Sequence, residues 1–96
     1  YRLAAAQGEP RSQNNLALSY GRGFGVPKNK VIAYALYNLS AIEKNEESYA
    51  RKNRDLLETQ LTPAQRRTAQ AISLKLQQSD DFLRTLDEAV QQTTGK

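Results

Sequence analysis

The side chains that most often do chemistry in proteins are sparse in this sequence. Its 96 residues include no cysteine and no histidine, which excludes thiol nucleophiles, imidazole bases, zinc fingers and disulfide scaffolds. Serine, threonine and tyrosine are present, but a Ser-His-Asp triad cannot be assembled within a chain that has no histidine. A metal site would have to use carboxylates alone. We therefore expect no catalytic residue, no metal site and no cofactor.

Two pairs of adjacent carboxylates, Glu46-Glu47 and Asp80-Asp81, are the remaining candidates for acid–base chemistry. Catalytic carboxylates need one partner that is buried and has a shifted pKa. Both pairs instead fall at the start of predicted helices, where ionised and solvated acids are favourable because the helix dipole is positive at that end. We expect these residues to cap helices.

A glycine-rich segment over residues 21–25, Gly-Arg-Gly-Phe-Gly, raises the possibility of a nucleotide site. It has neither the G-x-G-x-x-G spacing after a strand nor the Lys-Ser/Thr ending of a phosphate-binding loop. The glycines instead predict a tight turn between antiparallel helices, with a positive φ at Gly25. Phe24 and Val26 are expected to pack beneath this turn.

The formal net charge is +4, from 14 Lys and Arg against 10 Asp and Glu. The basic clusters, residues 51–54 and Arg66-Arg67, contain consecutive charges that spread around a helix instead of forming one stripe. Asp55 and Glu58 dilute the first cluster. Solvated helix faces are therefore favoured, and binding of nucleic acid or an anionic surface is the alternative, which would weaken steeply with salt.

The sequence pattern predicts that the elements positioning these residues are all helices, because apolar residues recur every three or four positions and no segment alternates with period two. Helices are expected to begin near residues 1, 10, 30, 46, 63 and 80, and residues 93–96 to fray. Pro10 suits a first helical position, Asn29 suits an N-cap, and Thr62 and Gln65 are spaced for a capping box around Pro63.

No apolar run approaches the length of a membrane span, since the longest weakly polar run, residues 31–36, is about a third of the ~18 residues required. The chain opens on Tyr1 without a basic region followed by an apolar one, so no signal peptide is expected. An opening in what looks like mid-helix predicts a fragment of a longer protein.

Aligning the chain with itself at an offset of 36 reveals a faint repeat. It pairs Tyr1 with Tyr37, Leu3 with Leu39, Ala5 with Ala41 and Ser12 with Ser48. Periods of this size are typical of repeats built from one helix–loop–helix pair, in which each pair leaves an apolar face that the next pair covers.

A set of small, aromatic and glycine residues also recurs at spacings typical of one family. The set is Ser12-Gln13, Leu16-Ala17, Tyr20, Gly23, Gly25-Val26, Asn29 and Ala33. It resembles the Sel-1-like repeat, a relative of the tetratricopeptide repeat, over about residues 1–50. The departures from the family pattern are Ser12 for Ala, Ala17 for Gly, Asn29 for Asp, Leu36 for Trp and Ser40 for Ala. The Asn-Arg-Asp-x-Leu stretch at residues 53–57, before Leu-Thr-Pro, is similar to the C-terminal end of many bacterial members.

The resemblance implies an all-α fold, a right-handed superhelix (α-solenoid) of antiparallel helix pairs. Residues 1–44 would hold the tail of one repeat and one full repeat, and residues 45–96 a degenerate repeat with C-terminal capping helices. It further implies a non-catalytic protein–protein interaction scaffold or adaptor of a bacterium, exported or periplasmic. An accessory domain of a larger enzyme is another alternative.

By the same resemblance, one face of the repeat's first helix lines the concave surface, where such proteins hold a protein or peptide partner. The family pattern does not specify the residue type at several positions on this helix, and these positions, with their counterparts on the fourth helix, are available to contact a partner. The predicted partner-binding residues are Asn14, Asn15, Leu18, Arg22, Lys52 and Asn53.

Overall fold

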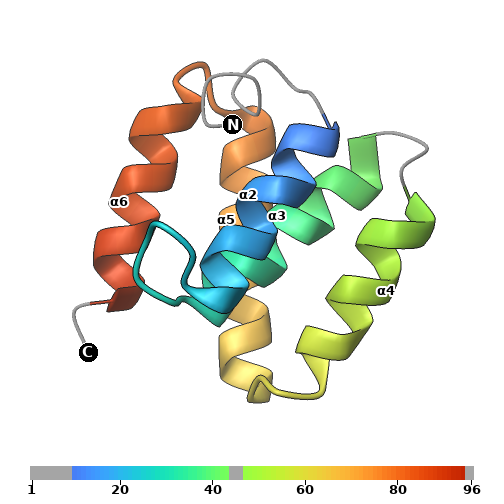
Figure 1. The fold of residues 1–96 in the computed structure, drawn as a ribbon. Coiled ribbons are helices and arrows are strands. Elements are labelled where there is room, and N and C mark those ends of the chain that lie inside the picture. Colours follow the sequence, from blue (N-terminus) through green and yellow to red (C-terminus); the bar gives the residue numbers. More distant parts are fainter. Residues whose placement is uncertain (1–9, 44–46, 95–96) are drawn as a thin grey trace.

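The computed structural model describes residues 10–43 and 47–94. Within these ranges the regular elements are all helices, joined by turns, as predicted (Figure 1). The helices are α2 (Pro10–Arg22), α3 (Lys30–Glu43), α4 (Glu47–Glu58), α5 (Pro63–Gln78) and α6 (Phe82–Thr94). The helix expected over residues 1–7 and the opening at Glu46 lie outside the described residues. None of the described helices has the length and apolar character needed to cross a membrane.

Local capping explains where the helices begin. The Asn29 Oδ1 atom accepts a hydrogen bond from the Ile32 amide at 3.1 Å. The Thr62 hydroxyl accepts one from the Gln65 amide at 3.1 Å, and the Gln65 side chain accepts one from the Thr62 amide at 2.9 Å, so the predicted capping box is confirmed. Asp81 accepts a hydrogen bond from the Arg84 amide at 3.2 Å, which confirms a capping role for that carboxylate. Each such cap is worth about 1 kcal/mol.

Helix α3 lies at the centre of the fold and contacts α2, α4, α5 and α6. Its residues 32–37 are all buried, with Ile32, Ala35 and Leu36 at 0% exposure. A helix that is apolar on every side requires neighbours on every side. This is why the other described helices are arranged around α3, with α2 antiparallel to it (Figure 1).

The molecule measures 29 × 27 × 25 Å along its principal axes. These nearly equal dimensions describe helices gathered around one central helix. The expected superhelical stacking of repeats therefore stays a prediction, whereas the all-helical architecture is observed.

The turn between α2 and α3 differs in part from expectation. Gly23 and Gly25 have φ of 77° and 75°, so the predicted positive φ at Gly25 is confirmed. Val26 packs against the core. The expectation for Phe24 is wrong: it lies between the two glycines, and its side chain points outward with 62% exposure.

Helix α6 packs its predicted apolar residues inward, with Phe82, Leu86 and Ala89 buried. The fraying predicted at Thr93 is wrong, because this residue is helical and its hydroxyl donates to the Ala89 carbonyl at 2.8 Å. The Asn29 Nδ2 atom in turn donates to the Thr93 hydroxyl at 2.8 Å. The last described turn of α6 is thereby joined to the turn before α3.

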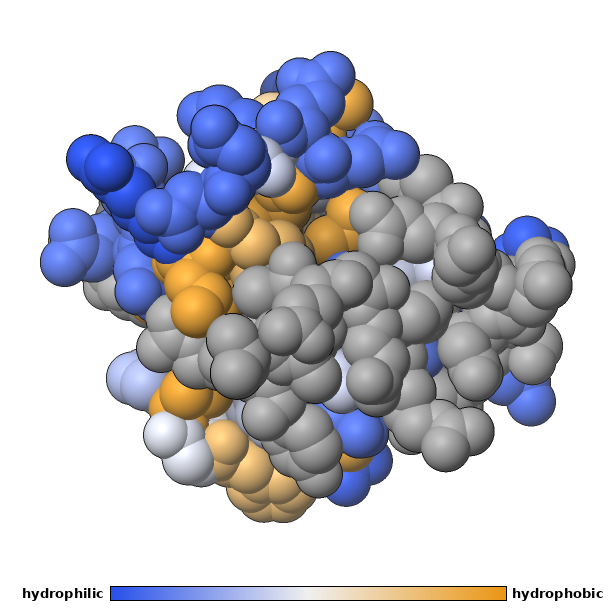
Figure 2. All heavy atoms as spheres, turned by 90° about the horizontal axis from the view of Figure 1, so that it is seen from above, coloured by the Kyte–Doolittle hydropathy of each residue, from blue (hydrophilic) through white to orange (hydrophobic). Residues whose placement is uncertain are grey.

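The described surface combines both kinds of side chain. In the view from above, hydrophilic side chains border a band of apolar ones (Figure 2). Among the described residues, the large apolar side chains that stay more than half exposed are Phe24 at 62%, Leu56 at 62% and Leu74 at 53%. Isolated exposed apolar residues are common in proteins, so their meaning depends on what surrounds each one.

Candidate functional site

Residues predicted to bind a partner meet at a hollow between α2, α3 and α4. Leu18 and Arg22 of α2 face Asn53 of α4 across this hollow, although more than 30 residues separate the two helix segments in sequence. Its volume is about 220 Å³. We call it the α2–α4 hollow, and it is lined by Leu18, Gly21, Arg22, Lys28, Lys30, Tyr37, Asn53, Leu56, Leu57 and Gln60.

The wall formed by α4 follows from helical spacing. Asn53, Leu56 and Leu57 lie three and four residues apart, so they share one side of α4, and Gln60 follows in the turn after the helix. Leu57 is partly buried and packs against the core, whereas Leu56 stays exposed at the edge of the hollow. Buried Tyr37 contributes from α3. The hollow thus offers apolar surface that no described residue covers.

Positive charge surrounds this apolar surface. The described residues that line the α2–α4 hollow include three cations, Arg22, Lys28 and Lys30, and no acid. The reason lies in the sequence, which has no Asp or Glu between Pro10 and Ile42. The missing acids leave the cations of this segment without counter-charges nearby along the chain.

Two acids of α4, Asp55 and Glu58, lie on its other side. Asp55 and Glu58 line a separate hollow of about 260 Å³ together with Thr59 and Arg66. Glu58 also accepts a hydrogen bond from the Tyr34 hydroxyl at 3.2 Å. Burial raises the pKa of Tyr34 above its ordinary value, and the neighbouring Glu58 carboxylate raises it further. Helix α4 therefore separates a cationic hollow from an acidic one.

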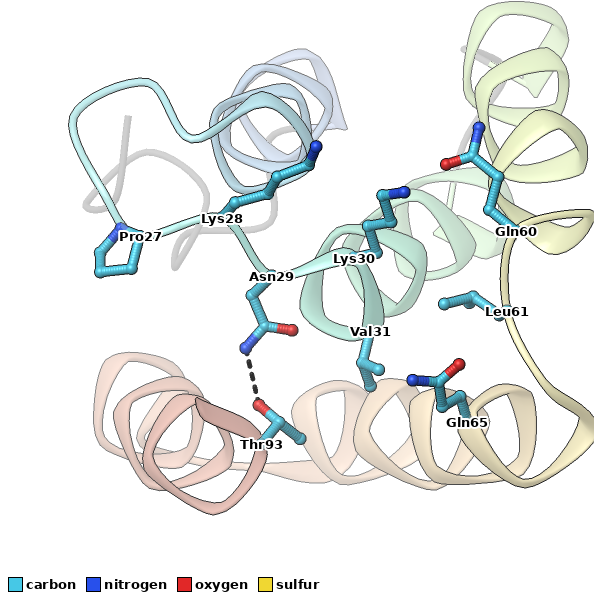
Figure 3. A pocket seen from close by; sticks show the side chains of 9 residues that line it. All are labelled: Pro27, Lys28, Asn29, Lys30, Val31, Gln60, Leu61, Gln65 and Thr93. Atoms are coloured by element: carbon cyan, nitrogen blue, oxygen red, sulfur yellow. Dashed lines mark hydrogen bonds between the residues drawn. The ribbon is translucent and has the colours of Figure 1, made fainter. Parts of the chain in front are cut away.

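A second, larger hollow adjoins the first. We call it the α5–α6 hollow; its volume is about 550 Å³, and Gln65 of α5 and Thr93 of α6 are among its lining residues (Figure 3). Lys28, Lys30 and Gln60 line both hollows. Figure 3 shows the Lys30 side chain extending toward the side on which Gln60 lies. The other described lining residues are Pro27, Asn29, Val31 and Leu61, so no acid is found in the part of this lining that the structure describes.

Three of the predicted residues lie outside both hollows. The structure corrects the open position expected for Asn14, which is only 3% exposed because it lies one helical turn before the fully buried Ala17. Asn15 is half-buried, and its carbonyl accepts a hydrogen bond from the Ser19 hydroxyl at 3.1 Å. Lys52 is exposed on α4 and does not line the α2–α4 hollow.

Sequence reasoning missed Lys28, Lys30 and Leu56 as site residues. The lysines had a signal that could have found them, because they belong to the segment without acids. Leu56 had none: its neighbour Leu57 has the same residue type, and only the position of α4 against α3 shows which leucine stays exposed.

Side-chain hydrogen bonds hold α4 in place. The Arg54 guanidinium donates to Asn38 Oδ1 of α3 at 3.3 Å, and the Asn38 amide donates to the Ser73 hydroxyl of α5 at 3.3 Å. Ser73 in turn donates to the Ala35 carbonyl at 2.9 Å. The Asn53 Nδ2 atom, by contrast, is buried without a hydrogen-bond partner. An unsatisfied buried donor costs about 1–3 kcal/mol.

Together these features supply apolar surface and cationic groups. Groups of three or more potential metal ligands are absent from the described residues.

Comparison with known proteins adds no family assignment. No family model matches the chain, and no curated protein or solved structure is significantly similar to it.

Proposed function

We propose that this chain is a protein–protein interaction module, a non-catalytic scaffold or adaptor that holds a segment of its partner in the α2–α4 hollow. The observation that carries the proposal is the convergence of Leu18, Arg22 and Asn53 on one hollow with an uncovered apolar surface. Buried aromatic and aliphatic contacts supply most of the binding energy at peptide and protein interfaces. An apolar hollow edged by polar groups has that composition.

The proposal includes the architecture implied by the Sel-1-like resemblance: a right-handed superhelix whose C-terminal end is this chain in a bacterial, exported or periplasmic protein. Two observations support it. Helix α3 contacts both its hairpin partner α2 and the following helices α4 and α5. The side of α6 away from the core is polar, with Arg84, Asp87, Glu88 and Gln91 exposed, and a terminal repeat needs such a polar face to stop further stacking.

A peptide-library selection tests the interaction proposal. Random peptides displayed on phage are selected against the chain, and the affinities of the enriched peptides are measured for wild type, Leu56→Asp and Leu74→Asp. These variants place the same charge at two exposed leucines, one in the hollow and one on α5 outside it. We expect Leu56→Asp to weaken binding by about tenfold or more and Leu74→Asp by less than about twofold. Equal losses in the two variants, or no enriched peptide, would refute the proposal.

A second candidate function, binding of single-stranded nucleic acid, is favoured by the 62% exposure of Phe24, which lies between Arg22 and Lys28 in sequence. Bases stack on exposed aromatic rings while cations contact phosphates. Oligo-dT affinity measured at several salt concentrations discriminates the two candidates. Nucleic-acid binding requires a steep fall with salt and a loss in Phe24→Ala, whereas peptide binding in the hollow requires neither.

A further inference from the structure

We propose that the segment held in the α2–α4 hollow is acidic, with one apolar side chain seated in the hollow and carboxylates beside it that contact Arg22, Lys28 and Lys30. This inference rests on the proposed function and specifies the chemistry of the partner. It follows from the size of the hollow, the charge around it and its continuity with the α5–α6 hollow.

The size of the α2–α4 hollow suits a side chain. Its volume of about 220 Å³ is below the ~300–1,000 Å³ typical of sites for whole small molecules. Leu18, Tyr37 and Leu57 supply its apolar surface, and exposed Leu56 lies at its edge. Burying a leucine- or phenylalanine-sized group there would cover Leu56, which no described residue does.

The charge around the hollow selects the flanking residues of the partner. Arg22 and Lys28 are exposed and Lys30 is half-buried, and among the described residues none of the three has a carboxylate partner. Among the described residues neither hollow is lined by an acid, and Asp55 and Glu58 of α4 lie on its other side. An acidic segment therefore meets three uncompensated cations and no like charge from a described residue, whereas a basic segment would be repelled.

Continuity between the hollows gives the segment a path. Lys28, Lys30 and Gln60 form the boundary that both hollows share. A chain anchored in the α2–α4 hollow and continuing into the α5–α6 hollow must pass these residues, which places its carboxylates against the two lysines. Gln60 at this boundary and Gln65 within the α5–α6 hollow (Figure 3) offer amide groups to the backbone of an extended peptide.

The composition of the selected peptides and a pair of charge-reversal variants test this inference. The phage selection is run at physiological ionic strength, and enriched peptides are assayed against Lys28→Glu/Lys30→Glu and against Arg67→Glu/Lys75→Glu. Both double variants change the net charge by the same amount, but Arg67 and Lys75 are exposed on α5 and line neither hollow. Circular dichroism and thermal melting establish that each variant is folded.

We expect enriched peptides to combine an apolar residue with flanking Asp or Glu. Their affinity should fall by about tenfold or more in Lys28→Glu/Lys30→Glu and by less than about twofold in the α5 control. Enriched peptides that are neutral or basic, yet still depend on Leu56, would overturn this inference and leave the proposed function standing. Peptides with no dependence on Leu56 would overturn both.

A polyanion without an apolar anchor completes the test. Oligo-dT is assayed on wild type, Leu56→Asp and Lys28→Glu/Lys30→Glu. We expect it to bind at least about tenfold more weakly than the acidic peptides, because it cannot fill the apolar hollow. Equal or tighter binding of oligo-dT, lost on charge reversal but unchanged in Leu56→Asp, would show a general polyanion site and refute the peptide inference.

Discussion

The α2–α3 hairpin and helix α4 form opposite walls of the candidate site, and they are held in different ways. Apolar residues of α2 (Leu16, Ala17 and Tyr20) join the same buried cluster as residues 32–37 of α3. Among the α4 side chains that the structure describes, residues 51–58, none is fully buried. Leu57 packs against the core while partly exposed, and side-chain hydrogen bonds from Arg54 and to Glu58 connect the helix to α3.

The two kinds of contact hold the walls of the hollow with different firmness. Close apolar packing resists small displacements, because moving one side chain opens a cavity. A helix segment held by one partly buried leucine and a few partly exposed hydrogen bonds opens locally at lower free energy. The α2–α3 wall is therefore the fixed reference of the hollow, and the α4 wall is the one that can adjust to an occupant.

Truncating a core side chain of the α2–α3 wall should destabilise the protein most. Leu36 of α3 is fully buried, and Leu57 of α4 is only partly buried. Leu36→Ala should lower the free energy of unfolding by about 2–5 kcal/mol, because it leaves a cavity in the core. Leu57→Ala should cost clearly less. Urea denaturation measures both, and similar losses would contradict the contrast between the two walls.

A smaller loss of stability is expected from changing the turn that joins the two helices of the α2–α3 wall. Gly25 has a φ of 75°, and an added Cβ would contact nothing within 4 Å. Gly25→Val should destabilise the fold by at least about 1–2 kcal/mol through backbone strain alone. Gly21→Ala is the matched control, because its Cβ would make an ordinary 3.5 Å contact with Ala33. Equal melting temperatures for wild type and Gly25→Val would count against the turn described here.

A smaller effect is expected at the hydrogen bonds that support the adjustable wall. Ser73→Ala removes the acceptor of the Asn38 amide and the donor to the Ala35 carbonyl. We expect a loss of about 1 kcal/mol in stability. Hydrogen exchange should quicken in α4 more than in α2, because the Asn38–Arg54 contact loses its support. Uniform quickening across both helices would show that α4 is not held separately.

The smallest effect is a dependence on alkaline pH. Burial raises the pKa of Tyr34 above 10.0, and Glu58 raises it further. The unfolded chain loses the Tyr34 hydroxyl proton at a lower pH than the folded chain does. The contribution of Tyr34 to the free energy of unfolding is therefore fully present below pH ~10 and is lost as pH rises through its folded-state pKa. Tyr34→Phe should lose less stability across that range than wild type, as measured by urea denaturation at successive pH values. Parallel pH profiles would contradict the assignment.

Much of the fold was predictable because its signals are local. The caps at Asn29 and Thr62 use bonds that span three residues, and the apolar run in α3 is visible without knowledge of its neighbours. The contacts that hold α4 were not predictable. Tyr34–Glu58 and Asn38–Ser73 join residues 24 and 35 positions apart, so they depend on how helices pack.

The candidate site was predictable in part for the same reason. Leu18, Arg22 and Asn53 were singled out from the sequence and now line one hollow. The inward position of Asn14 follows from its helical spacing to Ala17 and was available from the sequence. The outward position of Phe24 depends on the backbone dihedrals of the two glycines beside it, which the sequence alone does not show.

Asn29 also gives a chemical meaning to one departure from the family pattern it resembles. Its oxygen starts α3, while its nitrogen donates to Thr93 near the end of the described chain. A carboxylate at this position could accept the first bond, but it has no hydrogen to give to the second, and the Thr93 hydroxyl already donates to Ala89. While Thr93 donates to Ala89, an amide at this position can both accept the bond from α3 and donate the bond to α6, and a carboxylate cannot. The start of α3 and the attachment of the end of α6 therefore depend on one planar side-chain group.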